Sequence, residues 1–288
     1  MGKKGFTLIE LLVVISIIAL LMAVLIPALQ AAKETAQGIL CVSNLHTLSM
    51  AWFTYTVDNE GKLVGGQGVG EKIDNPATTD VYEPGEWVWY PISASGNSFT
   101  GWGPAGAASL ADKQRVIEYG ALFPYVKNIK VYHCLGDKRY KKPPEKGSGT
   151  CGGYRSYSIV GGMNGELFFS TSLKPIKVYP DIKAPAEKIV FVEDNDPRGW
   201  NCGSWVLALP SRQGGAWPME WHDPVALYHH NKGSLGFADG HALMRRWRDK
   251  RTTIYAEESF KNDDKSLRKK YGENNPDLRY LQECYPYK

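Results

Sequence analysis

The residues of this chain that could do chemistry are five cysteines, a pair of adjacent histidines and one isolated carboxylate. The cysteines form no Cys-x-x-Cys pair; they are Cys41, Cys134, Cys151, Cys202 and Cys284. A zinc ribbon or a redox motif is therefore not indicated. Outside the cytoplasm, the count would fit two disulfides and one leftover thiol, and the spacing alone leaves their connectivity open.

The isolated carboxylate is Glu10, near the start of an apolar run. Between residues 6 and 29 only Thr7, Glu10, Ser16 and Pro27 interrupt the apolar side chains. A carboxylate at mid-membrane costs about 2.5–3.5 kcal/mol, and less near an interface. Two interpretations follow. Glu10 complements the positive end of its helix dipole, or it pairs with a positive group inside the apolar environment.

The apolar run is long enough to cross a membrane. At ~1.5 Å per residue it makes ~36 Å of helix, against a bilayer core of ~30 Å. Lys3 and Lys4 precede it, so we expect the N-terminus to stay in the cytoplasm and the rest to be exported. A cleavable secretory signal has a shorter apolar region followed by a small-residue site, and residues 29–31 are a poor version of that site.

A cut between Gly5 and Phe6 would create a positive partner for Glu10. It frees an α-amine at the start of the helix, and at ~4 Å and a dielectric of ~20 the two charges attract by about 4 kcal/mol before desolvation. Glu10 follows Phe6 by four positions, so it could meet the amine of its own chain or that of a neighbour. The second pairing would be an assembly mechanism.

These residues carry a family resemblance. Gly5-Phe6-Thr7-Leu8-Ile9-Glu10 and the apolar run resemble the type IV prepilin signal of type IV pilins and type II secretion pseudopilins. The resemblance implies that a prepilin peptidase cuts after Gly5 and N-methylates Phe6, and that Glu10 guides docking into a helical filament. Pro27 resembles the proline that bends pilin helices, because proline removes one backbone donor.

The rest of the chain predicts an α+β, pilin-like fold. Beyond Pro27 one apolar stripe recurs at helical spacing, at Cys41, Leu45, Leu48, Trp52 and Tyr55. We expect a long N-terminal helix, half transmembrane and half amphipathic, packed on a C-terminal antiparallel β-sheet domain. The predicted parts are a leader (1–5), the helix (6–60, with 6–29 in the membrane or filament core), an α+β head (61–247) and a charged C-terminal extension (248–288) that resembles a surface appendage.

Three strand predictions matter below. Residues 188–192 are the clearest buried strand, and residues 131–134 are predicted as another. Asp239-Gly240 between two apolar segments predicts a hairpin with a tight turn. Since Cys41 lies on the helix stripe and Cys134 at a strand end, we favour a Cys41–Cys134 disulfide, which could contribute roughly 4–5 kcal/mol.

The sequence also offers a second disulfide pairing and a set of calcium ligands. Cys151 with Cys202 is the next disulfide candidate, which leaves Cys284 free. The acidic residues 193–196 could bind Ca²⁺ near Asp194 and Asp196 through oxygen ligands, as major pseudopilins often do in a C-terminal loop. The EF-hand spacing is missing, so an ordinary polar loop is the favoured interpretation, and no cofactor or catalytic metal is predicted.

A second resemblance lies near the C-terminus. His229, nine intervening residues and Asp239-Gly240 resemble the H-X9-DG element of a large group of prepilin-like proteins. His229, His230, Asp239 and His241 could form a metal site. We favour instead a histidine that hydrogen-bonds the hairpin.

The expected function is structural. No Ser/His/Asp set, phosphate loop or carboxylate pair indicates an enzyme, and a net charge of +4 gives no nucleic-acid footprint. The resemblance implies a homo-oligomeric, type IV pilus-like filament subunit. It would be cut by prepilin peptidase, held by one span in the inner membrane, assembled at an inner-membrane platform and displayed on the cell surface. One alternative is a type II secretion pseudopilin. Another is a membrane-anchored module that never polymerises and binds sugars through Trp87, Trp89, Trp102 and Trp200.

Overall fold

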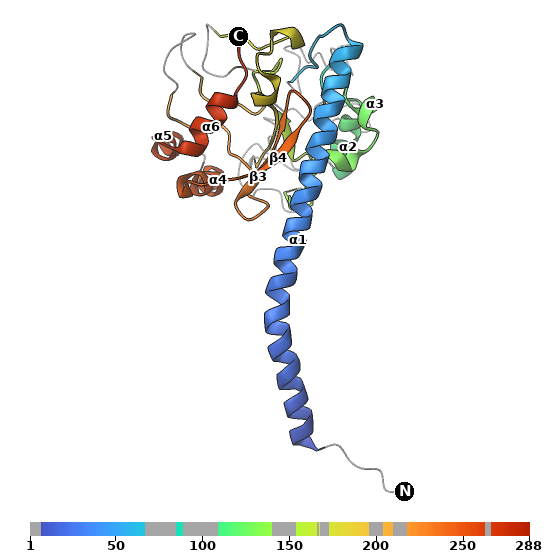
Figure 1. The fold of residues 1–288 in the computed structure, drawn as a ribbon, viewed down its shortest axis with the longest axis vertical. Helices are drawn as coiled ribbons and strands as arrows, with labels where there is room; N and C mark the ends of the chain where they lie inside the picture. Colours follow the sequence, from blue (N-terminus) through green and yellow to red (C-terminus); the bar gives the residue numbers. More distant parts are fainter. Residues whose placement is uncertain are drawn as a thin grey trace.

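A single helix, α1, runs from Leu8 to Asp58 and defines the shape of the molecule. In the computed structural model its C-terminal half lies along a head while its N-terminal half projects away (Figure 1). The described residues are 7–66, 85–88, 109–139, 154–165, 167, 173–195, 204–209, 218–262 and 266–288. The predicted long helix is confirmed, and Pro27 lies inside it without ending it.

The amphipathic half of α1 packs as its periodicity predicts. Cys41, Leu45, Leu48 and Trp52 are at most 1% exposed. Asn59 caps the helix end, and Gly61 follows in the left-handed region with φ of 80°. Because glycine has no Cβ, it adopts this conformation without strain and lets the chain turn toward the head.

The head contains one antiparallel sheet in the order β1-β2-β3-β4. The strands are β1 (Tyr157–Ile159), β2 (Ile189–Glu193), β3 (Lys232–Phe237) and β4 (Ala242–Arg246). Helix α1 packs mainly across β3 and β4. The close approach of α1 to β3 depends on Gly236, since a Cβ there would lie 2.4 Å from Ser49 Oγ on α1.

The β3–β4 hairpin confirms the predicted tight turn. Gly240 has φ of 96°, and its N–H donates to the Phe237 carbonyl at 3.0 Å. Such a positive φ favours glycine at the turn. The buried strand predicted at residues 188–192 is also confirmed, displaced by one residue as β2.

The strand predicted at residues 131–134 is wrong. Ile129–Tyr132 form a 3-10 helix, η2, which follows helices α2 (Leu110–Glu118) and α3 (Phe123–Val126). Lys127 has φ of 52°, and the Asn128 side chain accepts the Lys130 N–H at 3.0 Å. These local bonds start a tight helical turn where apolar composition alone favoured a strand. Two other 3-10 turns are η3 (Tyr179–Asp181) and η4 (Pro185–Glu187).

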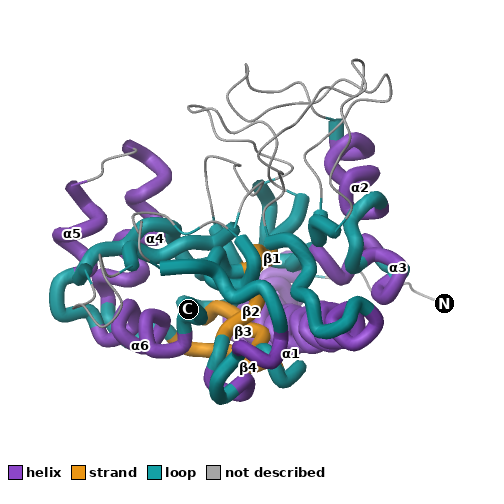
Figure 2. The backbone as a smooth tube through the Cα atoms, turned by 90° about the horizontal axis from the view of Figure 1, so that it is seen from above, coloured by secondary structure: helices purple, strands orange, loops and turns teal. Residues whose placement is uncertain are grey.

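The C-terminal residues are part of the head rather than a surface appendage. They form α4 (Lys250–Asn262), α5 (Ser266–Gly272) and α6 (Pro276–Cys284). Figure 2 shows these helices on one side of the strands, with α1, α2 and α3 on the other. Leu278, Leu281 and Tyr285 are buried in the same core as Trp52. The correction has a physical reason: apolar residues on one face of each helix outweigh the charges between them.

Candidate functional site

The N-terminal half of α1 presents an apolar surface on which no other described helix or strand packs. All residues from 8 to 33 are exposed, and Leu8, Leu20 and Leu29 are 79%, 69% and 72% exposed. Within the described part of the chain, α1 is the one helix long and apolar enough to span a membrane. Contiguous apolar patches of this kind mark contacts with other proteins or with lipid.

Glu10 is bonded to its own helix end in a reciprocal capping box. Its Oε2 accepts the Thr7 N–H and the Thr7 hydroxyl, both at 2.8 Å, while the Glu10 N–H donates to Thr7 Oγ1 at 3.2 Å. The arrangement satisfies backbone donors that the first turn leaves open. The role of Thr7 was not predicted, although Thr-x-x-Glu before an apolar run is the sequence signal for this cap.

Several predicted site residues lie outside the described residues. These are Gly5, Phe6, Cys151, Cys202 and Asp196, together with Trp89, Trp102 and Trp200. Trp87 is described, and the sugar-binding role proposed for it is wrong. Its side chain is fully buried against Tyr132, with ring centroids 6.1 Å apart.

Cys41 and Cys134 come together in the fold as free thiols. The predicted disulfide between them is not formed, and Cys284 is also a free, buried thiol. The two sulfurs instead share a buried cluster with a His229 nitrogen and a Glu193 oxygen, all four atoms lying within 4.8 Å of one another. An S–S bond requires about 2.05 Å between its sulfurs.

The buried cluster has defined hydrogen bonds. His229 Nε2 lies 3.3 Å from Cys134 Sγ and 3.2 Å from Glu193 Oε1. The Ser234 N–H and hydroxyl donate to Glu193 Oε2 at 3.0 and 2.9 Å. The Gly136 N–H donates to Cys134 Sγ at 3.3 Å. Cys134, Glu193 and His229 each therefore take part in more than one hydrogen bond.

Burial and mutual contact shift the pKa values within the cluster. A hydrogen bond with Cys41, together with burial and the charge of Glu193, strongly raises the pKa of the Cys134 thiol. Burial lowers the pKa of His229, but hydrogen bonds to Cys134 and Glu193 outweigh burial and raise it to about 10. These shifts favour the neutral form of Cys134 and the charged form of His229.

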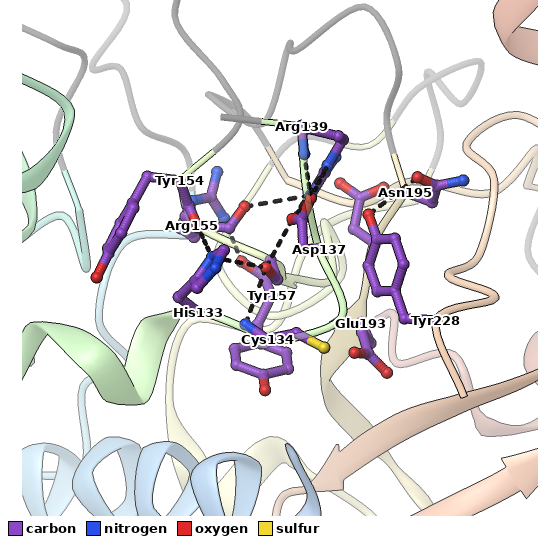
Figure 3. Close-up of polar contacts among 12 residues, drawn as sticks. His133, Cys134, Asp137, Arg139, Tyr154, Arg155, Tyr157, Glu193, Asn195 and Tyr228 are labelled. Atoms are coloured by element: carbon purple, nitrogen blue, oxygen red, sulfur yellow. Dashed lines mark hydrogen bonds and ion pairs between the residues drawn. The ribbon is translucent and has the colours of Figure 1, made fainter. Parts of the chain in front are cut away.

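An ion pair fixes the loop that carries Cys134. Arg139 donates to both Asp137 oxygens, at 3.0 Å from Nε to Oδ1 and 2.7 Å from Nη2 to Oδ2. The Ser156 hydroxyl donates to Asp137 Oδ2 at 2.7 Å and accepts the Cys134 N–H at 3.0 Å. Figure 3 shows this ion pair in the same close-up as Cys134 and Glu193.

The four residues predicted as a metal site around the hairpin, His229, His230, Asp239 and His241, do not form one cluster. His230 instead pairs with Glu34 at 2.6 Å, and His241 pairs with Asp239 at 2.6 Å. His229 bonds Glu193 on β2, not the hairpin turn, and Ser234 of the hairpin binds the same carboxylate.

The acidic residues after β2 have protein partners. Asp194 is buried and accepts the Ser158 hydroxyl at 3.1 Å, and Asn195 Oδ1 accepts the Tyr228 hydroxyl at 2.9 Å. Because Asp196 lies outside the described residues, the calcium site stays a prediction.

Comparison with known proteins identifies the N-terminal segment. Residues 1–26 match the model of the prokaryotic N-terminal methylation motif. The type IV wide pilus major component PilA4 of Thermus thermophilus is 50% identical over 98 residues, which are 34% of this chain and 70% of that protein. The type II secretion system core protein G of Dickeya chrysanthemi is 34% identical over 76 residues, 26% of this chain and 50% of its own.

A further core protein G, from Escherichia coli K12, is 35% identical over 74 residues, 26% of this chain and 51% of that protein. The chain thus spans about half the length of these secretion relatives, and no solved structure matches it. The relatives are components of a pilus and of a secretion system, not enzymes. Three features point to one family: the methylation motif, the apolar helix packed on an antiparallel sheet and the pilus relative that is 50% identical over 98 residues. The chain therefore belongs to the type IV pilin-like family, which has both pilus and secretion members.

Proposed function

We propose that this protein is a structural subunit of a type IV pilus-like helical filament, assembled after cleavage between Gly5 and Phe6. The observation that carries the proposal is the exposed apolar half of α1. Between Leu8 and Leu29, 16 large apolar side chains are between 45% and 79% exposed. At about 1.5–3 kcal/mol for each fully buried side chain, covering them is favourable by tens of kcal/mol.

The apolar half of α1 is covered first by the membrane and then by other subunits. Before assembly, a single span in the inner membrane places the head outside the cytoplasm, in agreement with Lys3 and Lys4 ahead of the helix. After assembly, the same residues pack against α1 of other copies in the filament core, and the heads coat the outside on the cell surface.

The geometry of Glu10 allows a contact between subunits without loss of the helix cap. Both Thr7 bonds end on Oε2, so Oε1 takes no part in the capping box. In the filament, Oε1 accepts a hydrogen bond from the Phe6 amine of a neighbouring subunit. Prepilin peptidase would create that amine, so processing and assembly are one mechanism.

The alternative is a pseudopilin of a type II secretion system. Its support is the 33–35% identity to three core protein G sequences. The 50% identity to the pilus component favours the pilus.

The test combines the mature N-terminus with filament imaging. We expect mass spectrometry to find an N-methylated Phe6, and Glu10→Val to insert and be processed normally but to form no filaments. Ser16→Ala is the matched control, since its hydroxyl donates within the helix to the Val13 carbonyl. Unchanged filaments in Glu10→Val would refute the pairing, and a mature protein beginning at Met1 would refute the processing step.

A further inference from the structure

We propose that Cys41, Cys134, Glu193 and His229 bind one Zn²⁺ ion that fastens helix α1 to the sheet of the head. The four residues come from four separate parts of the chain: α1, the loop after η2, the end of β2 and the segment before β3. Their relative exposures are 1%, 0%, 0% and 3%. The site is independent of filament formation.

The spacing of the ligand atoms suits a tetrahedral ion. With bonds of ~2.0 Å to nitrogen or oxygen and ~2.3 Å to sulfur, neighbouring ligand atoms are ~3.3–3.8 Å apart. His229 Nε2 lies 3.3 Å from Cys134 Sγ and 3.2 Å from Glu193 Oε1, and all four atoms lie within 4.8 Å of one another. An ion at their centre requires only small side-chain shifts.

The chemical types of the four ligand atoms favour zinc over calcium and magnesium. Two thiolates, an imidazole and a carboxylate match the sulfur, nitrogen and oxygen ligands of zinc sites. Calcium and magnesium require oxygen ligands throughout. Binding replaces the thiol protons of Cys41 and Cys134 and the Nε2 proton of His229, and these protons leave to solvent.

Groups outside the cluster already orient two of the four ligands, Glu193 and Cys134. Ser234 donates twice to Glu193 Oε2, which leaves Oε1 directed at the cluster. The Gly136 N–H bonds Cys134 Sγ, and such a bond stabilises a thiolate. His229 Nδ1 has no hydrogen-bond partner among the described residues. The hydrogen bonds that orient this ring are therefore those that Nε2 makes within the cluster.

A pocket beside α1 borders the cluster at one of its four residues, His229. This pocket is also lined by Glu34, Gly38, Val42 and His230, and it reaches the His229 ring from the surface.

The test is metal analysis of the full chain, purified from membranes in detergent without chelators. We expect one zinc per chain by elemental mass spectrometry. X-ray absorption should show two sulfur ligands at ~2.3 Å and two nitrogen or oxygen ligands at ~2.0 Å. Cys134→Ser and His229→Gln should lose the zinc. Cys284→Ser should keep it, because Cys284 is a buried free thiol outside the cluster.

Two results would overturn the site. One is a wild-type chain without zinc, in which peptide mapping finds Cys41 and Cys134 joined as a disulfide or both as free thiols. The other is full zinc occupancy in folded Cys134→Ser. If that variant does not fold, the zinc content and ligand distances of the wild-type chain decide the question alone.

Discussion

Truncation of Leu48 to alanine should loosen the docked half of α1 from the head. Leu48 is 0% exposed, so the whole side chain counts as buried. Leu48→Ala removes apolar carbons worth about 0.8 kcal/mol per CH₂ group. The cavity left behind adds to this, for a total of about 2–5 kcal/mol. At 1.4 kcal/mol per tenfold change, local opening of the helix becomes roughly 30- to 4,000-fold more frequent.

Hydrogen exchange of the α1 backbone measures this opening directly. Amides between Cys41 and Thr56 should exchange faster in Leu48→Ala by that factor, while exchange in the tail helix α6 changes less. Met50→Ala is the matched control two residues away, because Met50 is 41% exposed and its loss should cost about 0.5 kcal/mol or less. Equal exchange in the two variants would refute the assignment of the buried stripe from Cys41 to Trp52 as the surface by which α1 packs on the head.

Two further predictions concern the head. Burial alone would raise the pKa of Asp137, but the charge and hydrogen bonds of Arg139 lower it below its usual value. The stabilisation is therefore present above the unfolded pKa of ~3.9 and is lost as pH falls through the lower folded pKa. Thermal unfolding between pH 7 and 2 should show a weaker acid dependence in Asp137→Asn than in the wild type, and equal slopes would contradict this. Gly236→Val should destabilise by about 1–3 kcal/mol, because its Cβ meets Ser49 Oγ. Adding Ser49→Ala should recover part of that loss in denaturant unfolding, and strictly additive costs would contradict the contact.

Features set by neighbouring residues could be predicted from the sequence. The stripe from Cys41 to Trp52 follows from helical periodicity, and the β3–β4 hairpin follows from Asp239-Gly240. In both cases the chain's local preference and its tertiary packing agree. The wrong strand at residues 131–134 shows the limit, since side-chain capping by Asn128 decided the backbone there.

Features made by distant residues could not be predicted in the same way. Cys41 and Cys134 were expected to meet, but Glu193 and His229 follow them at no motif spacing. No local sequence pattern predicts that Glu193, at the end of β2, lies beside His229, which follows it by 36 positions. The burial of the charged C-terminal helices was not predicted for the same reason. Tyr285, for example, contacts Trp205, which lies 80 positions away in the chain.

The unbroken course of α1 has a mechanical consequence. Its 51 residues form a rod of about 77 Å at ~1.5 Å per residue, with the head packed on one end and the exposed apolar residues at the other. A pull on the head is therefore transmitted as shear along the buried stripe and then as tension along the rod. Pro27, which has no N–H for the helix ladder, lies in the exposed portion outside the docked residues. Bending under load concentrates there, so the shaft flexes while the head keeps its packing.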